Sequence, residues 1–188
     1  MKSASDTWTY CFLIPVYNHA ALLEQAIPSF LTFGILLIIV DDGSNQENKA
    51  ILKKIIDRHP DIVLISNTKN SGKGWAIKQG IEYCKQHAID FAFQVDADNQ
   101  HRLATIPAFI NRSKMQTTIK HAIIGYPIYD DTVPSIRKDG RKVSNFFVSI
   151  TTLAPNVRDS LCGFRIYPVT ETWRIYRNPF ISKRMPID

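Results

Sequence analysis

The sequence predicts an α/β fold built on a mainly parallel sheet with helices on both faces. Apolar runs of strand length alternate along the chain with segments whose apolar residues recur at helical spacing. The run at 35–40, ILLIIV, is apolar throughout, as in a strand that is covered on both sides. Each of the first four runs ends in a polar or glycine-containing loop. In an open parallel sheet, ligands bind at the edge where such loops leave the strands.

Each expected element begins and ends at a recognisable change in the sequence. Prolines, glycines and polar residues end the strands, whereas the helices carry apolar residues three or four positions apart. In the loop at 41–44 a glycine allows the turn, and Ser44 is the expected N-cap of the next helix. Pro107 is acceptable because it falls in the first turn of a helix. In chain order we expect a strand at 10–15, a helix at 20–33, a strand at 35–40, a helix at 47–58, a strand at 62–66, a helix at 75–87, a strand at 91–95, a helix at 103–112, a strand at 122–126 and a helix at 142–153.

The last expected helix carries an apolar stripe that has two alternative partners. A stripe at helical spacing faces the core in most globular domains, and this is the interpretation we adopt. The alternative is a face that contacts a membrane or another protein. The stripe consists of Val143, Phe146, Phe147, Ile150 and Leu153.

The composition is typical of one globular domain. The chain has 188 residues, of which 45% are hydrophobic and 21% charged, and this length suffices to bury a core. The formal net charge of +6 fits either an anionic partner or an ordinary lysine-rich surface. The three cysteines are far apart, which fits reduced thiols in a cytosolic protein rather than a metal or redox motif. No signal-peptide pattern is visible, and the longest apolar stretch, at 30–40, is too short to span a membrane.

The segment 91–101, FAFQVDADNQH, places two acids directly after a buried strand. Because side chains alternate along a strand, Asp96 and Asp98 point the same way. Two neighbouring carboxylates repel each other unless a cation lies between them, and Mg²⁺ or Mn²⁺ prefers oxygen ligands that it often shares with a diphosphate. Gln100 offers a third oxygen. The alternative is an acidic turn that only ends the strand.

Three further loops leave the carboxyl ends of expected strands, at 15–18, 41–44 and 67–74. In the first loop, Tyr17 either stacks on a nucleobase or is a half-buried tyrosine of the core. The two aspartates of the second loop either accept hydrogen bonds from a base or a ribose, or cap the following helix. We expect all three loops to meet the acidic pair at one edge of the sheet.

The third loop has the composition of a phosphate-binding loop. Its residues 70–74, NSGKG, supply small side chains, free backbone N–H groups and the cation of Lys73 near a helix N-terminus. The loop matches neither the P-loop motif of ATPases nor the dinucleotide-binding fingerprint, in which Ile77 stands where the third glycine belongs. A P-loop ATPase and an NAD enzyme are therefore disfavoured.

Taken together, FLIPVYN, IIVDDGS, NSGKGWAIKQGI and QVDADNQH resemble, in order and spacing, the motifs of family 2 glycosyltransferases with the GT-A fold. The resemblance is closest to the dolichyl-phosphate mannosyltransferase-like branch and runs from about Tyr10 to Pro168. It implies one GT-A domain, a nucleotide-diphospho-sugar transferase fold, over residues 1–188. It also implies that this chain, which stops at Asp188, lacks the C-terminal extension of longer relatives.

This resemblance implies roles for residues in all four loops. Lys73 would neighbour the base or the phosphates. The nucleotide-binding residues would be Pro15, Tyr17, Asn18, Val40, Asp42, Lys73, Asp96, Ala97 and Asp98. The ligands of the divalent metal, Mg²⁺ or Mn²⁺, would be Asp96, Asp98 and Gln100.

A second block, DSLCGFR at 159–165, resembles the D-x-x-C-G-F-R segment of the same branch. Arg165 is then a candidate for the acceptor or diphosphate pocket, because guanidinium groups suit phosphate. Asp159 is a candidate to take a proton from a hydroxyl acceptor. With Asp98, which acts through the metal, these two residues form the expected catalytic set. Three basic residues resemble a mobile segment that closes over the donor, or else form a solvated loop: Arg137, Arg141 and Lys142.

The implied reaction is a single displacement with inversion. The metal neutralises the diphosphate of a nucleotide-sugar donor while an acceptor attacks the anomeric carbon of the sugar. The expected acceptor is a lipid phosphate, such as a polyprenyl phosphate, or a glycan, and a phosphate is already ionised and needs no general base. The expected location is the cytoplasm, with peripheral contact at the inner face of the cytoplasmic membrane. We expect no nucleic-acid partner.

Three rival interpretations remain. A metal-dependent phosphatase of the haloacid-dehalogenase type also uses D-x-D after an apolar strand, but it expects Thr or Val where Gln100 stands. A nucleotidyltransferase that makes NDP-sugars expects a glycine-rich basic signature near the first strand, where this chain has VYNHA. The third is a glycosyltransferase-like domain that binds nucleotide but is catalytically impaired. Labelled NDP-sugars with Mn²⁺ distinguish these alternatives.

Overall fold

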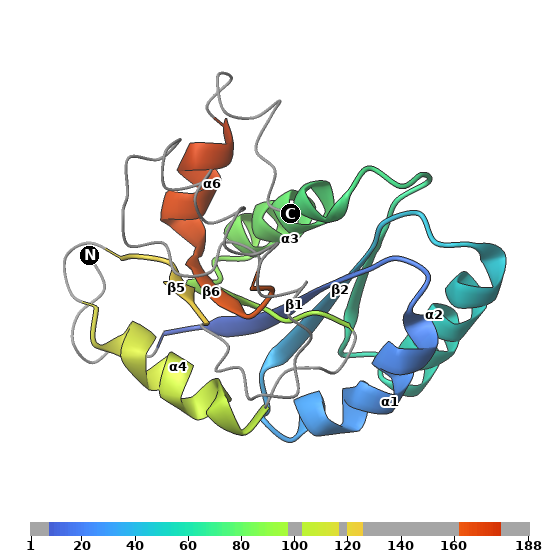
Figure 1. The fold of residues 1–188 in the computed structure, drawn as a ribbon, viewed down its shortest axis with the longest axis horizontal. Coiled ribbons are helices and arrows are strands. Elements are labelled where there is room, and N and C mark those ends of the chain that lie inside the picture. Colours follow the sequence, from blue (N-terminus) through green and yellow to red (C-terminus); the bar gives the residue numbers. More distant parts are fainter. Residues whose placement is uncertain (1–7, 98–102, 117–119, 126–161, 178–188) are drawn as a thin grey trace, which may run out of the picture.

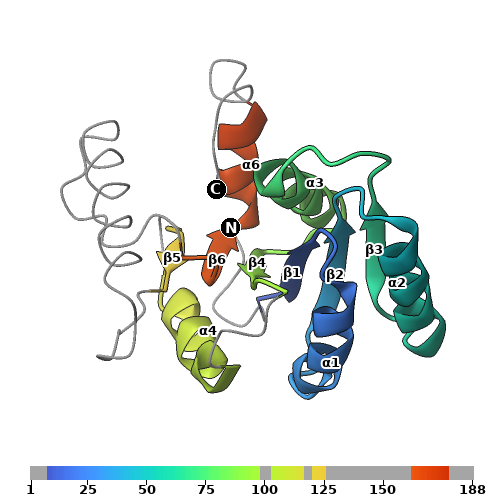
Figure 2. The ribbon, with the colours of Figure 1, turned by 45° about the vertical axis from the view of Figure 1, so that its right-hand side comes forward.

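The computed structural model describes residues 8–97, 103–116, 120–125 and 162–177 (Figure 1). In this part of the chain a central sheet separates two layers of helices (Figure 2). The expected helix at 142–153 lies outside the described residues. No described helix combines the length and the hydropathy that crossing a lipid bilayer requires.

The sheet has six strands in the spatial order β3-β2-β1-β4-β6-β5. The first four strands pair in parallel, which confirms the predicted parallel sheet. β6 is antiparallel to both of its neighbours, β4 and β5, so it runs against the rest of the sheet. The strands are β1 (Tyr10–Val16), β2 (Leu36–Asp41), β3 (Val63–Ser66), β4 (Phe91–Gln94), β5 (Ile123–Ile124) and β6 (Arg165–Pro168).

Alternate residues of the central strands build two separate cores, one on each face of the sheet. On one face, Phe12 and Phe93 pack with side chains of α1, α2 and α4. On the other face, Leu13 and Val40 pack with α3 and α6. The helices are α1 (Ala20–Leu31), α2 (Gln46–Arg58), α3 (Lys73–Gln86), α4 (Ile106–Lys114) and α6 (Val169–Arg177).

All three cysteines are buried, and none of them forms a disulfide bond. The Sγ atoms of Cys11 in β1 and Cys84 in α3 lie 3.3 Å apart. Burial, together with the contact with Cys84, raises the pKa of the Cys11 thiol. Cys11 therefore packs as a neutral thiol against Cys84, between the sheet and α3.

The structure corrects the sequence prediction at several elements. β6 and α6 were not predicted at all, and the expected helix at 103–112 begins as the 3-10 turn η1 (Leu103–Thr105) before it continues as α4. The N-cap of α2 is Asn45, whose side chain accepts a hydrogen bond from the backbone N–H of Asn48, rather than Ser44. The Ser44 hydroxyl instead accepts the backbone N–H of Asn18 at 2.9 Å, and this contact joins the first two loops.

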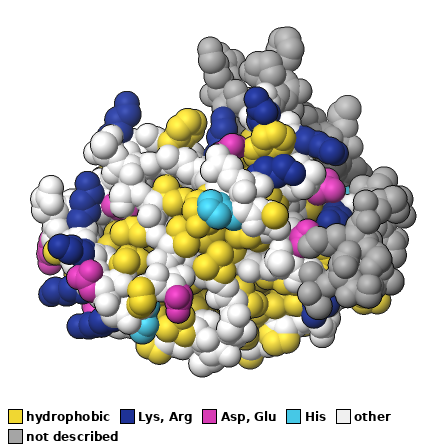
Figure 3. Space-filling model, turned by 180° about the vertical axis from the view of Figure 1, so that it is seen from behind, with side chains coloured by type: hydrophobic (Ala, Val, Ile, Leu, Met, Phe, Trp, Pro, Cys, Tyr) yellow, Lys and Arg dark blue, Asp and Glu magenta, His cyan; other side chains and the backbone are white. Residues whose placement is uncertain are grey.

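The face opposite to that seen in Figure 1 carries both apolar and basic side chains. Apolar side chains cover much of the middle of this face, and lysine and arginine side chains gather toward its margins (Figure 3). The positive charge of the chain is thus visible mainly around the apolar area on this side.

Candidate active site

A cavity of about 370 Å³ lies at the carboxyl ends of β1, β2 and β4. All four loops singled out from the sequence contribute to its wall, which confirms that they meet at one edge of the sheet. The α3 N-terminus also faces this cavity through the glycine-lysine loop. The lining residues are Pro15, Val16, Tyr17, His19, Asp42, Asn70, Gly72, Lys73, Ala76, Asp96 and Ala97.

Asp42 anchors the glycine-lysine loop. Its buried carboxylate accepts hydrogen bonds from the backbone N–H of Gly72 at 2.7 Å and of Ser71 at 3.1 Å, and from the side-chain amide of Asn67 at 2.9 Å. Gly72 has φ +95°, a conformation that glycine adopts without strain, and it is the N-cap of α3. Asp42 therefore fixes the entry of α3 at the cavity instead of capping α2.

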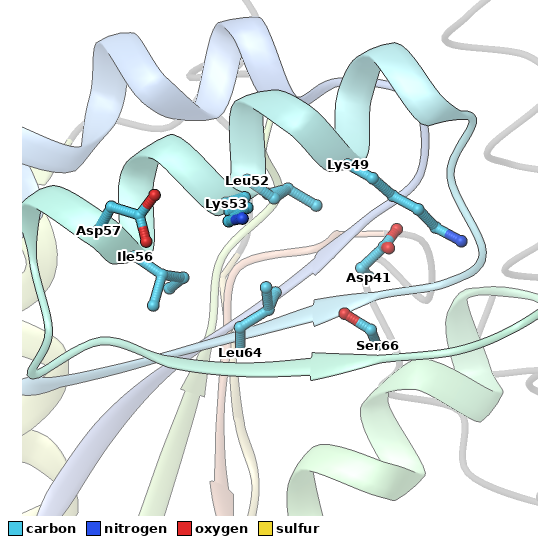
Figure 4. Close-up of a pocket in the computed structure, with 8 residues that line it drawn as sticks. All are labelled: Asp41, Lys49, Leu52, Lys53, Ile56, Asp57, Leu64 and Ser66. Atoms are coloured by element: carbon cyan, nitrogen blue, oxygen red, sulfur yellow. The ribbon is translucent and has the colours of Figure 1, made fainter.

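Asp41 points to the opposite side of the sheet from Asp42, because consecutive strand residues alternate. It lines a second cavity of about 240 Å³ between α2 and the strands β2 and β3 (Figure 4). Its Oδ1 accepts the backbone N–H of Ser44 at 2.9 Å, whereas its Oδ2 has no hydrogen-bond partner among the described residues. The two aspartates of the second loop thus line two different cavities, and only Asp42 lines the first one.

Tyr17 stands at the cavity as an exposed ring. Its side chain is 45% exposed and belongs to neither of the two described core clusters, so the alternative of a half-buried core tyrosine is wrong. The loop that carries it is held by Asn18, which has φ +56° and whose side-chain oxygen accepts the backbone N–H of Asn45 at 2.9 Å. Pro15 lines the cavity as predicted, whereas Val40 is fully buried in the core on the α3 side of the sheet.

Asp96 carries an ion pair inside the cavity. Its Oδ1 lies 2.7 Å from the Nζ atom of Lys73, and the two side chains are 25% and 33% exposed. The side-chain amide of Gln94 lies 3.4 Å from the same oxygen. A positive charge and a carboxylate from different loops therefore meet where the resemblance places a metal and a diphosphate.

Gly163 packs directly against the Asp96 carboxylate. A Cβ atom at this position would lie 1.9 Å from Oδ2 of Asp96 and 2.4 Å from Oδ1. The C-G-F-R part of the second block thus meets the D-x-D segment across 67 residues of sequence. This close approach explains why a glycine stands in the second block.

Arg165 lies at the start of β6, in register with Gln94 of β4. Its Nε donates to the carbonyl oxygen of Cys162, and its guanidinium lies 3.3 Å from the hydroxyl of Tyr167. The Tyr167 hydroxyl donates in turn to the side-chain oxygen of Gln94 at 3.0 Å, and burial raises the pKa of this phenol. Arg165 is not among the described residues that line the cavity, and it stabilises the turn beside it.

Several candidates lie outside the described residues, so their roles remain predictions: Asp98, Gln100, Asp159, Arg137, Arg141 and Lys142. Sequence reasoning in turn did not single out His19 or Ala76, which line the cavity. Their positions inside or next to the predicted loops were the available signal. Val40 lies in the core beneath the second loop, and Asn18 connects the first loop to Asn45. Neither residue lines the cavity, and a binding role for them stays a prediction.

The described residues fit a divalent cation, although they do not complete its ligand set. Among them, no group of three or more His, Cys, Asp and Glu side chains gathers around one point. Asp96 nevertheless offers the hard oxygen that Mg²⁺ and Mn²⁺ prefer. The Lys73 ammonium at 2.7 Å is a stand-in cation, which indicates that this position accommodates positive charge.

Comparison with known proteins decides the family. The model of a family described as glycosyl transferase family 2 matches residues 11–174, which is most of the chain. The chain belongs to glycosyl transferase family 2. Membership confirms the resemblance seen in the four loop motifs.

The relatives of this family 2 chain include named enzymes. A dolichyl-phosphate beta-glucosyltransferase of Trichomonas vaginalis is 28% identical over 96% of this chain, and one of Dictyostelium discoideum is 26% identical over 97%. An uncharacterized protein of Methanocaldococcus jannaschii is 29% identical over 82% of this chain and 69% of its own length. The chain spans 58% and 61% of the length of the two dolichyl-phosphate enzymes.

Solved structures confirm the predicted GT-A fold of the family 2 domain. Mannosyl-3-phosphoglycerate synthase from Rubrobacter xylanophilus superposes with a TM-score of 0.63 over 86% of this chain and 53% of its own, at 15% identity. A mannosyltransferase from Pyrobaculum calidifontis, in complex with GDP-Man and Mn²⁺, gives a TM-score of 0.51 over 64% of this chain and 36% of its own, at 19% identity. At such low identity, these similarities establish the fold alone.

Proposed function

We propose that this domain transfers a sugar, with inversion, from a nucleotide-diphosphate donor to a lipid-phosphate acceptor and depends on a divalent metal. The observation that carries the proposal is the meeting of the Asp96 carboxylate, the Lys73 ammonium and the exposed Tyr17 ring in one cavity. These are the groups that a metal, a diphosphate and a nucleobase need. They come from three loops at the carboxyl edge of a GT-A sheet.

The donor would lie between Tyr17 and the N-terminus of α3. An exposed aromatic ring is a suitable stacking surface for a base. The α3 N-terminus attracts phosphate through its positive dipole end, and Lys73, the first residue of α3, adds a full charge. Asp42 supports this arrangement because it holds the loop that carries both Gly72 and Lys73.

The metal would be held by Asp96 together with Asp98 and Gln100, which the family resemblance supplies. When bound, a divalent ion neutralises the diphosphate and makes the nucleotide a better leaving group. Gly163 keeps the Asp96 carboxylate in place from the other side. Asp159 and Arg165 remain the proposed residues of the acceptor side, where Asp159 would act as base only for a hydroxyl acceptor.

The acceptor is proposed from two observations. Four relatives are named dolichyl-phosphate beta-glucosyltransferases, and the chain carries a formal net charge of +6, which suits an anionic acceptor. A phosphate acceptor is already ionised at neutral pH, so the reaction needs no general base.

The test is a transfer assay with radiolabelled UDP- and GDP-sugars, Mn²⁺ and a polyprenyl phosphate, in which the product is extracted into organic solvent. We expect Mn²⁺-dependent label in the lipid phase, lost in Asp98→Ala and kept in the control Asp61→Asn, an exposed acid before β3. Release of phosphate from simple phosphomonoesters would instead favour the phosphatase. Nucleotide binding without turnover would favour the impaired domain.

A further inference from the structure

Lys73 lies beside Asp96, the carboxylate to which the proposed function assigns a divalent metal ion. Its Nζ atom lies 2.7 Å from Oδ1 of Asp96, and both side chains are mostly shielded from solvent. Lys73 is also the first residue of α3, next to the backbone N–H groups at that helix end. The flexible side chain of Lys73 can therefore reach two sites, the Asp96 carboxylate and the α3 N-terminus.

We propose that Lys73 is an exchangeable counter-ion. Its ammonium neutralises Asp96 while the site is empty, and it moves to the donor diphosphate when a divalent cation takes the carboxylate. This inference rests on the proposed function and deepens it, because it assigns Lys73 a role in coupling metal binding to donor binding. No bond is made or broken in this step, in which only two ionic contacts exchange.

The geometry around Asp96 favours movement of the lysine over movement of the carboxylate. Gly163 leaves no space on its side, since even a Cβ atom there would lie 1.9 Å from Oδ2. Gln94 lies 3.4 Å from Oδ1 on another side. A partly buried carboxylate is costly without a counter-ion, so Asp96 needs a cation both before and after the metal arrives.

The charges imply that Lys73 and a divalent ion compete for the Asp96 carboxylate. A divalent ion and the Lys73 ammonium repel each other at one carboxylate, so Lys73 weakens metal binding to the empty protein. A bound diphosphate attracts Lys73 toward the α3 N-terminus and removes that repulsion. Metal and donor must therefore strengthen each other's binding, and by linkage the factor is the same in both directions.

The experiment measures Mn²⁺ binding to the full chain by electron paramagnetic resonance, without and with GDP or UDP. In the absence of nucleotide, Lys73→Met should bind Mn²⁺ about tenfold more tightly than the unsubstituted protein, within the usual range of coupling factors. With Mn²⁺ present, the same variant should bind the nucleotide more weakly. Lys73→Arg keeps the charge and should keep the weak Mn²⁺ binding of the unsubstituted protein.

Lys78→Met is the matched control, because Lys78 lies on the same helix, with its Nζ 5.3 Å from the ring centroid of Trp75, and does not line the cavity. It should leave both affinities unchanged.

Unchanged or weaker Mn²⁺ binding by Lys73→Met overturns the inference, and Lys73→Gln repeats the test if the methionine variant folds poorly. If the unsubstituted protein binds neither Mn²⁺ nor nucleotide, the proposed function itself fails. If it binds both but the lysine variants match it, only the exchange fails.

Discussion

Replacing Gly163 by alanine should lower both the stability of the domain and its affinity for the donor nucleotide. The new Cβ would lie 1.9 Å from Oδ2 and 2.3 Å from Cγ of Asp96, where ordinary contacts begin at 3.4 Å. Relief requires either a rotation of the Asp96 side chain, which breaks its ion pair with Lys73, or a backbone shift before β6. Overpacking of this kind costs about 1–3 kcal/mol of unfolding free energy, and the partly exposed ion pair adds less than about 1 kcal/mol.

Rotation displaces the carboxylate from the position at which it would meet the metal, and a backbone shift removes the contact with Gly163 that holds the carboxylate there. We therefore expect Gly163→Ala to lower Mn²⁺-dependent binding of GDP or UDP at least about tenfold, or about 1.4 kcal/mol. Urea unfolding gives the stability and isothermal titration gives the affinity. The control is Gly34→Ala, which has φ +61° and no atom within 4 Å of the added Cβ, and which should cost about 1–2 kcal/mol through its backbone alone. Unchanged donor affinity in Gly163→Ala would refute the reasoning.

Three further predictions address the cavity and the core. Tyr17→Ala should weaken nucleotide binding by about 1–3 kcal/mol in titration and leave the melting temperature unchanged, because the ring is exposed and stacks on the base. Asp42→Asn should cost about 1–3 kcal/mol in urea unfolding and also weaken nucleotide binding, because an amide N–H₂ would face the N–H donors of the loop; full stability would contradict this. Burial raises the pKa of the Tyr176 phenol above its ordinary 10.0, so the folded state holds this proton more tightly. The free energy of unfolding is then unaffected by this group below pH 10 and falls as the pH rises beyond it. In unfolding experiments from about pH 9 to about pH 11, Tyr176→Phe should show a smaller fall of this free energy.

The parallel half of the sheet could be predicted because its signals are local. The run at 35–40 is apolar on both faces, and it forms β2 one residue later, at Leu36–Asp41. The parallel order then brings the loops after β1, β2, β3 and β4 to one edge without any knowledge of contacts. For this reason the sequence predicts that the loops of Tyr17, Lys73 and Asp96 meet at one edge, and in the structure all three residues line one cavity.

Other features depend on contacts between distant residues. β6 is only four residues long and is specified by antiparallel pairing with β4, which no local pattern reveals. The separation of Asp41 from Asp42 follows from strand alternation, but the second cavity depends on how α2 packs against β3. Likewise, the N-cap of α2 moves to Asn45 because the Ser44 hydroxyl is already engaged by another loop.

The most direct test of the account compares the affinity of the chain for GDP and UDP with Mn²⁺ and with a chelator, in the unsubstituted protein and in Asp96→Ala. We predict binding of at least one nucleotide that strengthens with Mn²⁺ and loses this metal response in the variant. Binding that ignores Mn²⁺, or a metal response that persists in Asp96→Ala, would contradict the assignment of this cavity as a metal-assisted donor site.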